Sequence, residues 1–147
     1  MSDLYPPVVL DHSRHPRNRR TISGCAHVAT GENPACGDEL RVFLALNDFE
    51  TIDDIAFDGK SCAIATASAS LMTEVLLGKT RVQARALFDR FYTIVTGGAN
   101  APDDGMEAEV QRLGALSALR DYPVREKCAT LAWLAMLAAL ESADRRA

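Results

Sequence analysis

Alternating apolar and polar positions predict β structure in the first half of the chain. In residues 39–47 every second side chain is apolar, from Leu40 to Leu46, which is the period of a half-buried strand. Ile55 and Phe57 repeat this alternation, and the short polar link at residues 47–48 suits a hairpin between the two strands. A weaker strand at residues 25–29 would complete a three-stranded antiparallel sheet.

Helical periodicity predicts most of the remaining elements. Residues 63–77 place apolar side chains on one face, and Gly78 is suited to end this helix. Thr80 can cap a further helix that runs to about residue 96. We also expect a first helix at residues 3–13 with a proline pair in its opening turn, a short helix at 106–119 and a last helix from about 124 to 144.

Length and composition predict one domain over residues 1–147, with the turn-rich stretch that starts at Gly97 opening an inserted segment at 97–121. Hydrophobic residues make up 48% and charged residues 24%, a balance typical of chains that fold by themselves. The net charge of -4 and the pI near 5.3 argue against a nucleic-acid partner, because coating phosphate backbones needs a basic surface.

The sequence predicts a cytoplasmic protein without a membrane partner. No basic stretch leads into an apolar run at the start, so we expect no secretory signal. The longest strongly apolar stretch, residues 131–140, is about half of the roughly 20 residues that a membrane-spanning helix needs. In a reducing compartment, the four cysteines are better interpreted as ligands or reactive thiols than as disulfides.

A basic connector at residues 14–20 separates the first helix from the sheet. Pro16 breaks any helix there, and five of the seven residues are arginine or histidine. We interpret it as a solvated loop, and the alternative is a docking patch for an acidic partner surface.

Three cysteines lie at predicted ends of elements and form a candidate metal site. Cys36 lies among turn formers between the first two strands, and Cys62 stands just before a helix, where free amides favour a thiolate. Cys128 lies in the first turns of the last helix, on one stripe with Val124, Leu131 and Ala135. With Asp38 two residues after Cys36, these thiols make a plausible tetrahedral zinc set of three sulfurs and one oxygen.

The charge of such a site needs compensation. Zinc with three thiolates and one carboxylate carries a net charge near -2, which Lys60, Arg125 and Lys127 could offset. Spacing alone leaves open that the cysteines are buried and inert, because no Cys-x-x-Cys pair is present. Cys25, which has no carboxylate or cation close in sequence, is interpreted as a small packing residue.

The surroundings of the cysteines resemble those of one protein family. Asn-Pro-Ala-Cys-Gly-Asp at 33–38, together with residues 59–72 and 124–133, resembles the three signature blocks of the IscU/NifU/SufU superfamily. The scaffold branch of that superfamily usually has a histidine before its last cysteine. This chain has Lys127 there and carries the extra segment, and both features resemble SufU.

The resemblance implies an α+β fold, in which the three-stranded antiparallel sheet packs against about five helices, and a role in iron–sulfur cluster assembly. It implies zinc held by the residues that match Cys36, Asp38, Cys62 and Cys128. Cys36 would act as a sulfurtransferase nucleophile, taking persulfide sulfur from a SufS-type cysteine desulfurase for a downstream scaffold. Arg125 would assist the partner enzyme's site.

Chemistry favours Cys36 as the acceptor, because its glycine-flanked loop gives it freedom and the oxygen ligand Asp38 can yield more readily than sulfur. Two alternatives stay open. The same cysteines could hold an Fe–S cluster on a scaffold, or the zinc could be purely structural in a protein-binding module.

Overall fold

The computed structural model describes residues 5–25, 27–34, 37–97 and 105–142, and these ranges form a sheet with helices. The elements, in chain order, are α1 (Pro7–Arg14), β1 (His27–Asn33), β2 (Asp38–Leu46), β3 (Ile52–Lys60), α2 (Ala63–Leu76), α3 (Arg81–Thr96), α4 (Glu107–Leu113), the 3-10 helix η2 (Gly114–Asp121) and α5 (Pro123–Ser142). The predicted α+β fold is therefore confirmed.

The three strands form an antiparallel sheet in the order β1-β2-β3, as predicted. The alternation in β2 has the expected cause, because Leu40, Val42 and Leu44 are fully buried. β1 runs from His27 to Asn33, so the prediction of a strand at residues 25–29 was wrong in its bounds. Most of its side chains are half-buried, which removes the alternation that marks a strand in sequence.

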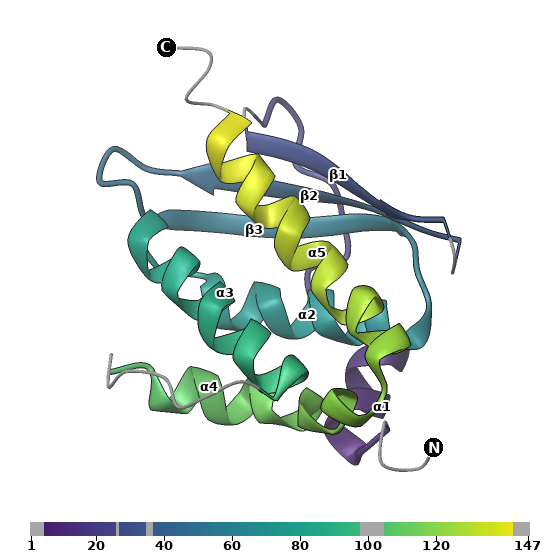
Figure 1. Ribbon diagram of the computed structural model, residues 1–147. Coiled ribbons are helices and arrows are strands. Elements are labelled where there is room, and N and C mark those ends of the chain that lie inside the picture. The colour runs from purple at the N-terminus through teal and green to yellow at the C-terminus, as the bar shows by residue number, and fades with distance from the viewer. Residues whose placement is uncertain (1–4, 26, 35–36, 98–104, 143–147) are drawn as a thin grey trace.

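Helix α5 crosses the sheet, and α2 packs against both α5 and β3 (Figure 1). The contact between α5 and β1 is close, because a Cβ atom added to Gly31 would lie 3.0 Å from Leu131 Cδ1. On the other side of α5, the ring of Trp133 stacks on Phe91 of α3 with centroids 4.7 Å apart. The core thus lies between the sheet and the helices, with α5 at its centre.

A buried polar cluster joins α1 to α2. His12 is almost fully buried and its Nδ1 lies 2.7 Å from Ser70 Oγ, while its Nε2 lies 3.4 Å from Glu74 Oε1. The same Ser70 hydroxyl accepts a hydrogen bond from the Arg17 backbone N–H at 2.8 Å, and Asn18 Nδ2 donates to Thr73 Oγ1 at 3.0 Å. The segment after α1 is thereby fixed to the middle of α2.

The basic connector contacts the chain's own acceptors. Arg17 Nη2 donates to Asp11 Oδ2 at 2.6 Å, and Arg20 Nη2 donates to Asp54 Oδ1 at 2.5 Å. Arg19 Nη2 donates to the carbonyl oxygen of Gly59 at 2.8 Å. These three arginines are engaged within the chain, which favours the interpretation as a surface loop over a docking patch.

The segment at 97–121 contains α4 and η2, and its residues 98–104 lie outside the described ranges. Arg112 forms an ion pair with Glu74 on α2, and Lys79 Nζ lies 3.8 Å from Glu109 Oε2. η2 leads directly into the start of α5. This segment therefore packs against the helices and delivers the chain to the end of α5 that carries Cys128.

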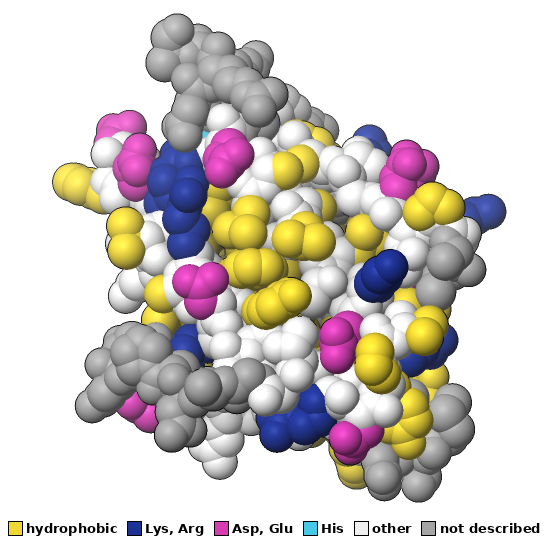
Figure 2. All heavy atoms as spheres, viewed as in Figure 1, with side chains coloured by type: hydrophobic (Ala, Val, Ile, Leu, Met, Phe, Trp, Pro, Cys, Tyr) yellow, Lys and Arg dark blue, Asp and Glu magenta, His cyan; other side chains and the backbone are white. Residues whose placement is uncertain are grey.

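On the face seen in Figure 2, hydrophobic side chains gather over α3 and α5, with acidic and basic side chains around them. Tyr92 and Leu134, which these helices carry, are about half exposed. Among the described residues, no helix combines the length and the hydropathy that crossing a bilayer requires.

Candidate metal centre

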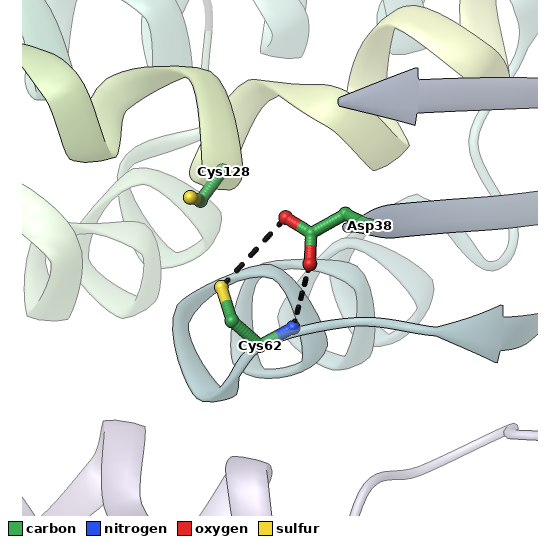
Figure 3. A group of neighbouring side chains, drawn as sticks. All are labelled: Asp38, Cys62 and Cys128. Carbon is green, nitrogen blue, oxygen red and sulfur yellow. Dashed lines mark hydrogen bonds between the residues drawn. The ribbon is translucent and has the colours of Figure 1, made fainter. Parts of the chain in front are cut away.

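Asp38 is the first residue of β2, directly opposite Asn33 at the end of β1. Its side chain is 3% exposed, and Oδ1 accepts a hydrogen bond from the Cys62 backbone N–H at 2.8 Å. Oδ2 lies 3.8 Å from Cys62 Sγ. One carboxylate oxygen is thus fixed by the backbone, while the other is directed towards the thiol (Figure 3).

Cys62 is the N-cap residue of α2, as its position before a helix predicted. Its Sγ accepts a hydrogen bond from the Ala65 backbone N–H at 3.4 Å, the role that an oxygen plays in an ordinary cap. The sulfur therefore lies at the positive end of the helix dipole.

Cys128 lies in the second turn of α5 and is fully buried. The neighbouring Ala129 carbonyl accepts a hydrogen bond from Ser68 Oγ of α2 at 2.5 Å, which fixes this turn of α5 against α2. Leu131 and Ala135 share the buried stripe, as predicted, but Val124 is 76% exposed. The prediction was wrong for Val124 because the first turn of α5 extends beyond the core.

The three side chains converge on one point. The donor atoms of Asp38, Cys62 and Cys128 all lie within 4.8 Å of one another, although they come from three different elements (Figure 3). In a tetrahedral zinc site, with bonds of about 2.3 Å to sulfur and 2.0 Å to oxygen, neighbouring donors are separated by roughly 3.5–3.8 Å. Two sulfurs and an oxygen at this spacing fit zinc with only small movements of the side chains.

Gly59 makes the approach of β2 and β3 possible next to the site. Its φ is +127°, and a Cβ atom there would lie 2.1 Å from the backbone oxygen of Glu39. Any side chain would push apart the strand ends that carry Asp38 and lead to Cys62. Of the four predicted ligands, the structure brings together these two and Cys128, while Cys36 lies outside the described residues.

Arg125 is the predicted cation that lies in the site. Its Nη2 donates to the Tyr5 hydroxyl oxygen at 3.1 Å, and its Nε is buried with no hydrogen-bond partner within the described ranges. Burial lowers the pKa of the guanidinium, but interactions with Tyr5, Cys62 and Cys128 outweigh this and leave the pKa raised. Arg125 lies three residues before Cys128 on α5, which places it beside the candidate ligand on the same helix.

Lys60 and Lys127, the other two predicted cations, have exposed side chains. The sequence analysis missed Asn33, a buried residue whose Nδ2 lies 3.9 Å from Cys128 Sγ. Its position directly before the proline of the Cys36 turn was the only signal. Cys25 is half-buried, and its Sγ donates a hydrogen bond to the backbone oxygen of Leu44 at 2.8 Å. Its interpretation as a small packing residue stays a prediction.

Comparison with known proteins identifies relatives of the whole chain. The family model described as the NifU-like N-terminal domain matches residues 4–129. The iron–sulfur cluster assembly scaffold protein IscU of Streptococcus pyogenes is 37% identical over 142 residues, which cover 96% of this chain and 85% of that protein. The zinc-dependent sulfurtransferase SufU of Bacillus subtilis is 34% identical over 136 residues, which cover 92% of this chain and 88% of that protein.

A solved structure has the same architecture. It is a candidate iron–sulfur cluster assembly scaffold protein for the SUF system from Fervidobacterium islandicum, with a TM-score of 0.82 and 27% identity over 93% of this chain and 96% of that one. The two relatives carry different functional names, one a scaffold and the other a sulfurtransferase. Similarity alone therefore gives the family, and the chemistry of the site must be used to choose between the two activities.

Proposed function

The chain belongs to the NifU-like N-terminal domain family, and from that premise we propose that it is a SufU-type protein of iron–sulfur cluster assembly. It accepts persulfide sulfur from a SufS-type cysteine desulfurase and passes the sulfur on towards a downstream assembly scaffold. Its ligands are Cys36, Asp38, Cys62 and Cys128, and its cofactor is zinc.

The observation that carries this proposal is the convergence of two sulfurs and a carboxylate oxygen within 4.8 Å. Thiolates are preferred by zinc, and a third cysteine two residues before Asp38 would complete a four-coordinate site. Bound zinc would hold the thiolates deprotonated without oxidising them, because it has no redox chemistry of its own.

Sulfur transfer needs only a thiolate on this chain. The Cys36 thiolate attacks the outer sulfur of the partner's cysteine persulfide, and a new S–S bond forms as the partner's S–S bond breaks. The partner's cysteine leaves as a thiolate, and Cys36 carries the persulfide. No oxidant or reductant is required, because the transferred sulfur keeps its oxidation state.

Arg125 is suited to assist at the boundary with the partner. The residue is half-buried three positions before Cys128 on α5, and one N–H group of its guanidinium has no acceptor in the described part of the chain. An anionic persulfide entering the site would meet this positive charge.

The alternative function is a scaffold on which an Fe–S cluster is built, and the name of the Streptococcus pyogenes relative favours it. Lys127 favours the relay, because the residue before the last cysteine is here an exposed side chain that offers no imidazole to a cluster. Anaerobic reconstitution with iron and sulfide separates the two functions. A stable, transferable cluster supports the scaffold, and unchanged tight zinc supports the relay.

The test of the relay is Cys36→Ala, with Cys25→Ala as the matched control. We expect Cys36→Ala to abolish stimulation of the partner desulfurase, and we expect the parent and Cys25→Ala to gain the mass of one sulfur atom. Alanine release by the desulfurase and intact-protein mass spectrometry measure the two effects. Stimulation by Cys36→Ala equal to that of the parent would exclude Cys36 as the nucleophile.

A further inference from the structure

A hydrogen bond connects the start of the described chain to the candidate metal centre. The Tyr5 hydroxyl accepts from Arg125 Nη2 at 3.1 Å, although the two residues are 120 positions apart in sequence. The Tyr5 ring is half-buried and packs against the hydrophobic core immediately before α1. This contact brings the segment before α1 to the first turn of α5.

The rest of the guanidinium has few hydrogen-bond partners. Arg125 Nε is buried and no acceptor within the described ranges reaches it. The backbone N–H of Arg125 bonds to the Tyr122 carbonyl at 2.8 Å, which fixes the backbone at this position. Within the described ranges, the Tyr5 hydroxyl is the group to which the guanidinium donates a hydrogen bond.

The position of that charge matters because of the donor set. Three thiolates and a carboxylate, the proposed ligand set, carry four negative charges, and a zinc ion cancels only two of them. An arginine side chain without a fixed partner would extend into water, where its charge is better hydrated and screened. Arg125 lies three residues before Cys128 on α5, so the guanidinium that Tyr5 holds belongs to the same face of the helix as that thiol. The donor atoms of Cys62 and Asp38 lie within 4.8 Å of the Cys128 sulfur.

We propose that Tyr5 is a positioning residue of the metal centre, whose hydroxyl holds the Arg125 guanidinium on the side of α5 that carries Cys128 and so supports metal binding by the thiolates. The inference rests on the ligand set of the proposed function, but it requires no sulfur transfer. Groups that orient or support metal ligands typically contribute about 10–100-fold in metal affinity.

The experiment is a double-mutant cycle on the full chain. Tyr5→Phe keeps the ring and removes only the hydroxyl, Arg125→Ala removes the guanidinium, and the third variant combines both changes. Zinc affinity is measured by competition with a chromophoric chelator, and Co²⁺-loaded protein reports the sulfur-to-metal charge-transfer band. Tyr92→Phe is the control, because that ring is 51% exposed on α3. Circular dichroism confirms that each variant is folded.

We expect Tyr5→Phe and Arg125→Ala each to weaken zinc binding by about 10-fold and to shift the charge-transfer band in the same direction. The double variant should bind zinc no more weakly than Arg125→Ala, because both changes remove one interaction. Tyr92→Phe should match the parent.

A Tyr5→Phe affinity within about 2-fold of the parent, or effects that multiply in the double variant, would overturn the inference. A different result would show that the proposed sulfur relay is wrong. In that case the zinc affinities of the variants would follow the expected pattern, but the parent protein would acquire no persulfide from the desulfurase.

Discussion

Two polar clusters lie along α2, and they differ in how their hydrogen bonds are satisfied. In the middle of the helix, Ser70 and its neighbours pair donors with acceptors from α1 and the connector at 2.7–3.0 Å. At the N-terminus, Asp38, Cys62 and Cys128 bring two sulfur atoms and a carboxylate oxygen within 4.8 Å of one another. The first cluster pairs its donors with acceptors, whereas the second gathers groups that can together hold a metal ion.

The difference gives a criterion for separating structural from functional polar groups. A buried cluster in which each donor meets an acceptor stabilises one arrangement of helices and needs no ligand. A cluster of thiol and carboxylate groups whose donor atoms converge can also coordinate a metal ion, which makes it a candidate binding site. We therefore expect substitutions in the two clusters to have opposite profiles for metal binding and stability.

The largest effect is expected at the metal end. Cys62→Ala should weaken zinc binding by more than about 100-fold, because it removes a ligand rather than a supporting group. The free energy of unfolding of the metal-free protein should decrease by no more than about 1 kcal/mol, since the thiol is only a weak helix cap. Chelator competition and urea unfolding measure the two quantities. Zinc affinity equal to that of Cys25→Ala would remove Cys62 from the ligand set.

Ser70→Ala should show the reverse profile. The change leaves His12 Nδ1 and the Arg17 backbone N–H without their shared partner, which costs about 2 kcal/mol of unfolding free energy. Zinc affinity should stay within about 2-fold of the parent. Ser23→Ala, at an exposed loop position, is the control and should change stability by less than about 0.5 kcal/mol. A large loss of zinc affinity in Ser70→Ala would show that the clusters are coupled.

The smallest effect is a pH dependence of stability from His12. Burial lowers the His12 pKa below its usual 6.5, aided by Arg17 and Arg112 and opposed by Glu74 and Asp11. In the unfolded chain the histidine is therefore protonated near pH 6.5, whereas in the folded chain it is protonated only at lower pH. The free energy of unfolding is highest above pH 6.5 and decreases below it, by at most about 1.4 kcal/mol per pH unit.

Urea unfolding of the metal-free protein between about pH 5.5 and 7 tests this dependence. In His12→Gln the slope should become shallower, because the group that is protonated only in the unfolded state is gone. An unchanged slope would assign the pH dependence to other groups.

The elements that were predicted well have a clear pattern within their own sequence, such as alternation or a capping residue. The alternation in β2 and the Thr80 cap of α3 both have their expected structure, and Thr80 forms a capping box with Gln83. β1 was predicted poorly because its place depends on α5, which packs Leu131 against Gly31. Such a contact joins residues 100 positions apart and leaves no periodic signal in either segment.

The residues of the candidate site could be predicted from the sequence, but their arrangement in space could not. The residue types around Asp38 and Cys62 indicated a metal site, yet their approach depends on the register that pairs Glu39 with Lys60. The hydrogen bond between Tyr5 and Arg125 could not be predicted, because it joins residues 120 positions apart in sequence. Sequence patterns identify donor atoms more readily than the groups that orient them.

The order of the three donors along the chain has a consequence for synthesis in the cell. Asp38 and Cys62 emerge from the ribosome before Cys128, which lies on α5. A nascent chain that lacks α5 therefore presents an incomplete set of these donors. With the proposed ligand set, tight metal binding would have to wait until α5 has been made.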